Sequence, residues 1–143
     1  MVTCTTYGRW LQGDKRGYVK HGKTLPGNQQ ILLANQKLLK SESVKLNSGQ
    51  RKIVYKAILN EAKRISQTIE ALAVCENHVH IVARPCQESI PEIVSRYKNV
   101  AMLALCKDTH VSRIWTRGFD KRFCFTEVDL RCRIDYVHKH PSF

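Results

Sequence analysis

The chain has 143 residues, among them 24 Lys or Arg against 12 Asp or Glu, so its formal net charge at pH 7 is +12. This length suits a single domain over residues 1–143, and a hydrophobic content of 43% is too high for a disordered basic tail. No apolar run approaches the roughly 18 residues of a membrane span, and the N-terminal residues lack the pattern of a secretory signal. We therefore expect a soluble intracellular domain whose positive field attracts an anionic partner, with nucleic acid favoured over charge that serves solubility alone.

The first half of the chain predicts one strand, a long insertion and two helices. Threonine and aromatic residues favour a strand over residues 2–7. A long basic loop with helical character follows over residues 8–47, because glycines and a proline interrupt it repeatedly, and it contains a short helix over residues 28–40. Ser48 is the expected N-cap of a helix over residues 49–66, whose apolar residues recur at helical spacing.

The second half predicts a hairpin, a helix and a fourth strand. Runs of apolar residues favour strands over residues 68–75 and 78–84, joined by a tight turn. A capping box that begins at Ser89 opens a helix over residues 90–106. A short strand is expected over residues 122–125.

The chain ends in a helix that begins at a second capping box. This box is Thr126-Glu127-Val128-Asp129, and Pro141 should end the helix. The order β-α-β-β-α-β, followed by this helix, predicts an α+β fold of the ferredoxin-like kind with an added C-terminal helix.

Two histidines lie on one predicted strand, at His78 and His80. Side chains alternate along a strand, so both imidazoles should project from one face while Val79 enters the other. Two neutral imidazoles side by side are half of a plausible divalent metal site. The alternative, which this motif alone favours, is one histidine packed in the core and the other solvated.

The last helix offers a tyrosine and a histidine on one edge. Tyr136 and His140 are four residues apart and share a face with Asp129 and Arg133, whereas His138 points about 200° away from His140. A neighbouring apolar stripe should dock on the sheet, and it consists of Leu130, Ile134 and Val137. The alternative is a surface helix with an incidental aromatic residue.

The segment Asn77-His78-Val79-His80-Ile81-Val82 is the centre of a pattern that extends over nearly the whole chain. Other parts of the pattern lie, in chain order, at residues 5–17, 43–46, 49–66, 114–119 and 136–141. Together these segments resemble the REP-associated tyrosine transposases, which belong to the single-tyrosine class of HUH-type single-strand DNA nucleases.

The resemblance implies a transposase, an enzyme that cleaves and transfers single-stranded DNA at hairpin, REP-like elements through a covalent 5′-phosphotyrosine. It places the nucleophile at Tyr136, and it places the ligands of a divalent Mg²⁺ or Mn²⁺ ion at His78, His80 and His140. Relatives usually carry Asn or Gln at the third ligand position. The imidazole of His140 is softer than an amide and shifts the preference toward manganese and heavier metals.

The resemblance also implies a monomer rather than a dimer, without a membrane partner, in the bacterial cytoplasm at the nucleoid. Two alternatives remain open for the activity. One is a replication initiator or relaxase-like enzyme that nicks DNA with the same fold. The other is a non-catalytic remnant that binds hairpin DNA without cutting it.

Aromatic residues interleaved with cations suggest where an unpaired strand would lie. Trp10, Tyr18 and Trp115 could stack bases. The residues that we expect to contact DNA are Arg9, Trp10, Lys15, Arg16, Arg113, Trp115, Arg117 and Arg133. A core-anchoring role for Trp115 is equally compatible with the sequence. A salt bridge between Arg133 and Asp129 is equally compatible with it.

Overall fold

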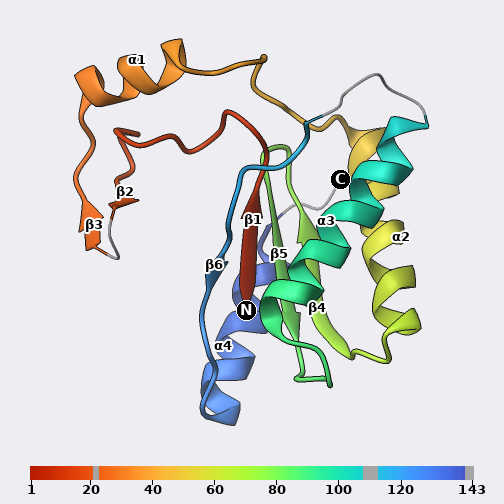
Figure 1. Ribbon diagram of the computed structural model, residues 1–143. Coiled ribbons are helices and arrows are strands. Elements are labelled where there is room, and N and C mark those ends of the chain that lie inside the picture. The colour runs from red at the N-terminus through yellow and green to blue at the C-terminus, as the bar shows by residue number, and fades with distance from the viewer. Residues whose placement is uncertain (21–22, 108–112, 141–143) are drawn as a thin grey trace.

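The computed structural model describes residues 1–143 except 21–22, 108–112 and 141–143. Over the described residues the chain forms four helices, a four-stranded antiparallel sheet and a separate two-stranded sheet (Figure 1). The spatial order in the larger sheet is β4 (Ile69–Val74), β5 (His78–Ala83), β1 (Val2–Thr5) and β6 (Asp120–Lys121). The predicted α+β class is confirmed. None of the helices in the described ranges is long and apolar enough to cross a membrane.

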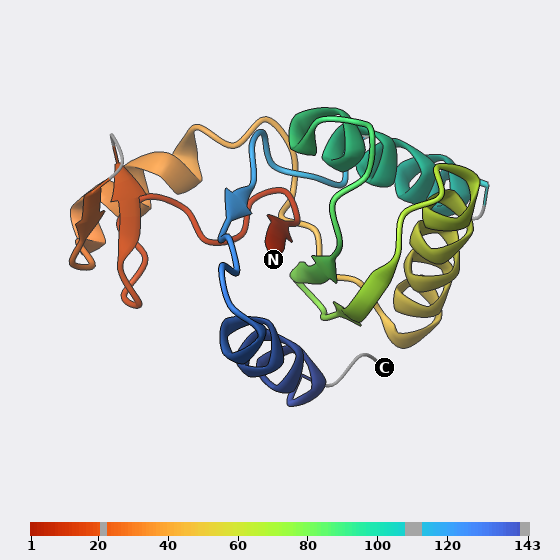
Figure 2. The same cartoon turned by 90° about the horizontal axis from the view of Figure 1, so that it is seen from below.

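Helices cover both faces of the larger sheet (Figure 2). On one face α2 (Ser48–Arg64) and α3 (Ile90–Cys106) enclose the main core. The largest fully buried side chains of that core are Leu46, Ile58, Leu105, Ile114, Val54, Val74 and Val79. On the other face α4 (Glu127–His138) covers a smaller cluster that consists of Ala71, Ala73, Val82 and Val137. The predicted docking of the stripe Leu130, Ile134 and Val137 is confirmed, because all three belong to this cluster or pack against it.

The capping boxes at Ser89 and Thr126 begin α3 and α4 as predicted. The prediction of Ser48 as the N-cap of α2 is wrong, because that cap is Asn47. The Asn47 side chain accepts a hydrogen bond from the Gln50 amide at 2.9 Å, and the Gln50 side chain accepts one from the Asn47 amide at 2.9 Å. This reciprocal pair satisfies two helix-end donors, so the helix starts one residue earlier.

The fourth strand lies two residues before its predicted position over residues 122–125. Only Asp120 and Lys121 form β6, which pairs with Thr3 and Val2 of β1. The Arg122 amide then donates to the Met1 carbonyl at 2.8 Å. The register with β1 places the strand, because Val2 and Thr3 pair with Lys121 and Asp120 and not with residues 122–125.

The insertion after β1 is more ordered than a loop. Residues 8–43, which we call the arm, contain β2 (Tyr18–Lys20), β3 (Lys23–Leu25) and α1 (Gln29–Lys37). Helix α1 lies within the range predicted for it, but the hairpin of β2 and β3 was missed, because strands of three residues are too short to show an alternating pattern. The arm extends away from the larger sheet in both views (Figures 1 and 2).

Candidate functional site

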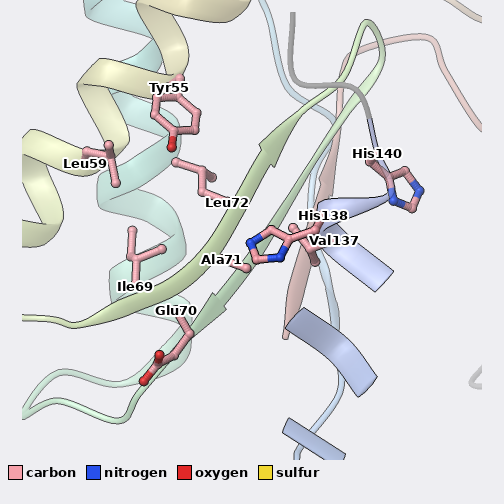
Figure 3. A pocket seen from close by; sticks show the side chains of 9 residues that line it. All are labelled: Tyr55, Leu59, Ile69, Glu70, Ala71, Leu72, Val137, His138 and His140. Atoms are coloured by element: carbon pink, nitrogen blue, oxygen red, sulfur yellow. The ribbon is translucent and has the colours of Figure 1, made fainter. Parts of the chain in front are cut away.

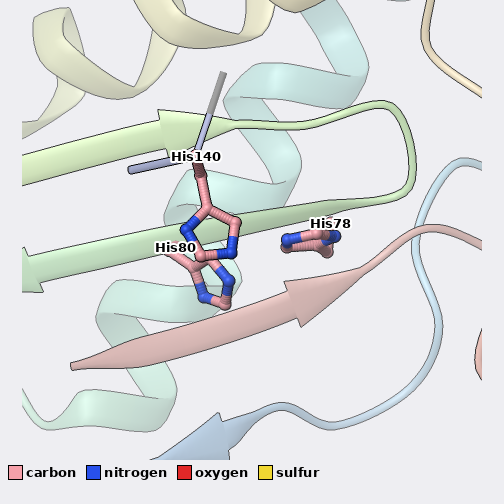
Figure 4. A group of neighbouring side chains, drawn as sticks. All are labelled: His78, His80 and His140. Carbon is pink, nitrogen blue, oxygen red and sulfur yellow. The ribbon is translucent and has the colours of Figure 1, made fainter. Parts of the chain in front are cut away.

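The two strand histidines project from one face of β5. Their ring centroids are 4.6 Å apart (Figure 4). Val79 between them is only 1% exposed and belongs to the main core on the opposite face. The strand alternation therefore places both imidazoles on one face, as the sequence predicted, and Val79 on the other. The structure adds that this face is the one that α4 covers.

His140 completes a group of three imidazoles. It lies just past the end of α4, where its amide donates to the Val137 carbonyl at 3.1 Å and continues the turn of the helix. Its ring centroid is 4.8 Å from that of His80 and 5.8 Å from that of His78. One potential ligand atom from each of the three histidines lies within 4.8 Å of the others, so the group can hold a metal ion.

His138 lies outside this group, as its angular separation from His140 predicted. Both residues border a hollow of about 330 Å³ between α2, β4 and the end of α4. Figure 3 shows the two imidazoles at different sides of the end of α4. Only His140 reaches the strand histidines.

Tyr136 borders the histidine group. Its ring centroid lies 4.6 Å from that of His140 and 5.4 Å from that of His80. Its side chain is 43% exposed. A phenol and three potential metal ligands thus meet at one place that a large substrate can approach from solvent.

Each histidine of the group has its Nδ1 atom paired with an oxygen that can accept its proton. The partners are Asn77 Oδ1 at 2.6 Å for His78, Thr3 Oγ1 at 2.9 Å for His80, and the Tyr136 carbonyl at 2.8 Å for His140. Such bonds fix the ring orientation and leave Nε2 as the metal ligand. The donor set therefore fits a divalent metal ion.

The sequence interpretation named none of these three partners. Asn77 is adjacent to His78 in the sequence, and that adjacency was an available signal. Thr3 faces His80 across the pairing of β1 with β5, where the register joins these two residues. No local pattern reveals this contact, because it depends on the strand register.

Burial keeps the strand histidines in the form that binds metals. The pKa of His78 is lowered to about 4, chiefly by burial and further by the positive charges of His140 and Arg16. The pKa of His80 is lowered to about 3, again chiefly by burial and then by His78 and His140. Both rings are therefore neutral near pH 7, and a neutral imidazole is the ligating form.

The residues expected to contact DNA lie in three places. Arg9, Trp10, Lys15 and Arg16 belong to the arm, where Trp10 is 46% exposed. Tyr18, also on the arm, is only 7% exposed, so its ring is not available for stacking.

The second group of predicted DNA contacts follows α3. Arg113 lies with its guanidinium carbon 4.5 Å from the centroid of the Tyr7 ring, and Arg117 is exposed. Trp115 packs against the main core, and its indole N–H donates to the Lys98 carbonyl at 3.0 Å. These contacts are those of a core anchor, which is one of the two roles that the sequence left open for Trp115.

The third place is α4, where Arg133 is partly buried on the same helix as Tyr136. Asp129, its sequence-suggested partner, instead caps the helix, because its carboxylate accepts from the Thr126 amide at 3.2 Å.

No family model matches this sequence, and no curated protein matches it. Among solved structures, the chain is similar to a REP-associated tyrosine transposase bound to a REP hairpin, with a TM-score of 0.59 and 16% sequence identity. The alignment covers 96% of this chain but only 62% of the other, so this chain spans less than two thirds of the length of that protein. At this identity the similarity concerns the fold.

Proposed function

We propose that this protein is a metal-dependent single-strand DNA endonuclease and strand transferase of the REP-associated tyrosine transposase type. The observation that carries the proposal is that Tyr136 lies beside His78, His80 and His140 at an exposed position. These residues come from β5 and from the end of α4, which are far apart in the sequence. The strand order β4-β5-β1-β6, with α2 and α3 on one face, supports the ferredoxin-like arrangement that this activity uses.

The proposed reaction exchanges one phosphate ester for another. The Tyr136 oxygen forms a bond to the scissile phosphorus, and the bond from phosphorus to the 3′ oxygen breaks. The phenol gives up its proton and the departing 3′ oxygen gains one, which leaves a 5′-phosphotyrosine and a free 3′-OH. Because the intermediate is still a phosphate diester, a DNA hydroxyl can later displace the tyrosine without an external energy source.

The protein residues position this exchange. His78, His80 and His140 would hold a divalent ion through their Nε2 atoms, with three imidazoles favouring Mn²⁺ over Mg²⁺. When bound, that ion supplies charge stabilisation to the phosphate oxygens. His140 also ties the site to the nucleophile, because its Nδ1–H donates to the backbone carbonyl of Tyr136.

The proposed substrate is single-stranded DNA that folds into a hairpin. The structural neighbour was solved with a REP hairpin, and the net charge of +12 suits a polyanion. The site lies on the face of the sheet that α4 covers, and the 43% exposure of Tyr136 lets a strand reach it from solvent. We propose that the protein acts on such hairpins as a monomer at the bacterial nucleoid.

The test is formation of a covalent adduct. End-labelled hairpin oligonucleotides are incubated with the protein and Mn²⁺ or Mg²⁺, and the products are separated by denaturing electrophoresis. We expect an adduct with the wild-type chain and with the control Tyr55→Phe, and none with Tyr136→Phe, which should still bind the hairpin.

Three results would overturn all or part of the proposal. An adduct with Tyr136→Phe would show that the nucleophile is another group. Metal dependence that is unchanged in His140→Ala would remove His140 from the ligand set. If the wild-type chain binds the hairpin but forms no adduct with either metal, it is a non-catalytic hairpin-binding protein.

A further inference from the structure

The arm is a small unit that the segments at residues 6–7 and Val44, which we call the neck, join to the rest of the protein. At the neck the Val44 amide donates to the Tyr7 carbonyl at 2.8 Å, and the Lys40 amide donates to the Tyr7 hydroxyl at 2.9 Å. None of the residues of α1 is buried. Within the arm, the Asn28 amide donates to the Gly13 carbonyl at 2.9 Å and joins the segments before β2 and after β3. The arm therefore has hydrogen bonds of its own, and none of its described residues belongs to the main core.

Trp10 occupies an unfavourable backbone conformation at the base of the arm. Its φ is 51°, in the left-handed region that bulky side chains seldom adopt. The indole N–H donates to the Gly17 carbonyl at 2.9 Å, while 46% of the side chain stays exposed. Strain of this kind persists where the surrounding structure enforces it, and it is concentrated at functional sites. Here the strain presents a large aromatic ring to solvent instead of burying it.

Arg16 is fixed against the same ring. Its guanidinium carbon lies 4.6 Å from the centroid of the Trp10 ring. Two of its nitrogens, Nε and Nη2, donate to the carboxylate of Asp14 at 2.8 and 2.7 Å. An arginine held by a carboxylate and an aromatic ring loses little freedom when it binds an anion, so this pair is preorganised.

The neck leaves the sheet at the end where the candidate metal site lies. Thr5, the last residue of β1, pairs with His78, and the Thr6 amide donates to the Asn77 carbonyl at 2.9 Å. Asn77 in turn orients His78 through its side chain. The arm therefore leaves the sheet beside the strand end that carries His78.

The charge of the arm fits a polyanion. Its cations are Arg9, Lys15, Arg16, Lys20, Lys23, Lys37 and Lys40. Its acids are Asp14 and Glu42, and because Asp14 pairs with Arg16, six cations face one unpaired acid. A cationic surface with an exposed aromatic ring is the combination that single-stranded nucleic acids bind.

We propose that Trp10 and Arg16, which we call the arm platform, bind one unpaired nucleotide of the strand next to the scissile phosphate. The base stacks on the exposed part of the indole, and the guanidinium contacts the adjoining phosphate. This inference rests on the proposed function, since it names the part of the DNA that the arm contacts. It also separates Trp10 from Trp115 and Tyr18, whose rings serve the interior.

The strongest competing aromatic surface lies at the opposite end of the sheet. Phe123 and Phe125 are 58% and 86% exposed, with ring centroids 6.0 Å apart. They follow β6, whose Lys121 pairs with Val2 rather than with the end of β1 near His78. This position makes Phe125 a suitable control for an exposed aromatic side chain that is remote from the histidines.

The experiment measures hairpin affinity without metal, so that no cleavage occurs. Fluorescence anisotropy compares a labelled DNA hairpin with single-stranded flanks of mixed sequence against the same hairpin with blunt ends. The test variant is Trp10→Gly, because glycine adopts a φ of 51° without strain. The control variant is Phe125→Ala.

We expect Trp10→Gly to weaken binding of the flanked hairpin by about 5- to 150-fold, which is the range for loss of one stacked base. Binding of the blunt hairpin should stay within about twofold, and Phe125→Ala should change neither. The second measurement is tryptophan fluorescence. In Trp115→Phe, which keeps Trp10, the flanked hairpin should quench the emission. In Trp10→Phe, which keeps Trp115, the emission should stay unchanged.

Several outcomes would overturn the arm platform. They are unchanged affinity of Trp10→Gly for the flanked hairpin, an equal loss for both hairpins, or a loss in Phe125→Ala instead. This failure is distinct from failure of the proposed function. A Tyr136-dependent adduct together with normal binding by Trp10→Gly removes the platform alone, whereas a Trp10-dependent flank contact without any adduct removes the catalytic proposal alone.

Discussion

The candidate site depends on which nitrogen of each imidazole is free. Asn77, Thr3 and the Tyr136 carbonyl engage the three Nδ1 atoms, so the Nε2 atoms are the ones left for a metal. Thr3 lies on β1, Asn77 lies in the turn between β4 and β5, and the carbonyl belongs to the helix that carries the tyrosine. At the scale of single residues, metal affinity should therefore depend on the hydrogen-bond partners of the histidines as well as on the histidines themselves.

Replacing Thr3 with valine tests this dependence. Valine keeps the shape and the strand preference of threonine but removes the oxygen that faces His80 Nδ1. We expect the affinity for Mn²⁺ to fall by about 10- to 100-fold, as is typical when such a partner of a metal ligand is lost. The measurement is a titration of the metal-free protein followed by electron paramagnetic resonance.

The matched control for this prediction is Thr5→Val. Thr5 lies two residues further along β1, and its hydroxyl contacts Thr116 Oγ1 at 2.7 Å rather than a histidine. Its loss should leave the Mn²⁺ affinity within about twofold of the wild type. Equal losses in both variants would mean that Thr3 acts through the general stability of β1 and not through the His80 ring.

At the scale of elements, α4 is attached to the sheet by a small apolar contact. Val137 is 1% exposed and packs on Ala71, Ala73 and Val82, with Leu130 and Ile134 beside it. The opposite face buries a much larger cluster under α2 and α3. Of the helices that cover the larger sheet, α4 should therefore open most easily, and it carries both Tyr136 and the turn that ends in His140.

Val137→Ala should weaken this attachment. Removing two buried methyl groups should lower the free energy of unfolding by about 2 kcal/mol, because apolar burial is lost and a cavity remains. Because α4 docks independently of the main core, we expect its amides to lose hydrogen-exchange protection before those of α2 and α3. Chemical denaturation and hydrogen exchange measure the two effects.

Val128→Ala is the matched control on the same helix. Val128 is 70% exposed, so its truncation should change the free energy of unfolding by less than about 0.5 kcal/mol. If Val137→Ala instead lowered exchange protection evenly over the whole sheet, α4 would be part of one cooperative unit with the main core.

At the scale of the whole molecule, the excess of positive charge is uneven. The arm projects from the end of the sheet near the histidines and carries seven of the 24 Lys and Arg residues with two acids. Charge on α2, by contrast, lies on the face of the sheet that has no histidine group. The arm should therefore provide a larger share of the phosphate contacts than its length alone would predict.

Salt dependence measures these contacts. Each phosphate contact that is lost lowers the slope of log affinity against log salt concentration by about 0.7 to 0.9. We expect Lys15→Gln, on the exposed arm, to reduce the slope for the flanked hairpin by roughly one such contact. Anisotropy titrations at several salt concentrations give the slope.

Lys56→Gln is the control, since it removes the same charge from an exposed position on α2. Its slope should match that of the wild type. Equal reductions in the two variants would show that the DNA responds to net charge alone and that the arm has no special place in binding.

Much of the architecture was predictable because its signals are local. The capping boxes at Ser89 and Thr126, the bounds of α3, and the common face of His78 and His80 follow from residues close together in the sequence. The cap of α2 was misplaced by one residue, because Asn47 and Ser48 are both good caps and only the Gln50 contact selects between them.

By itself, the sequence determined an α+β chain with a strand that presents two histidines on one face and a helix that presents Tyr136 and His140 on one edge. Periodicity fixes such placements, since each residue's direction depends on its own strand or helix. Only the tertiary structure decided that the strand and the helix meet, that Thr3 faces His80, and that β6 ends where β1 begins. It also decided that Trp10 is exposed while Tyr18 and Trp115 turn inward. These facts depend on strand register and on packing between distant segments, which no local pattern encodes.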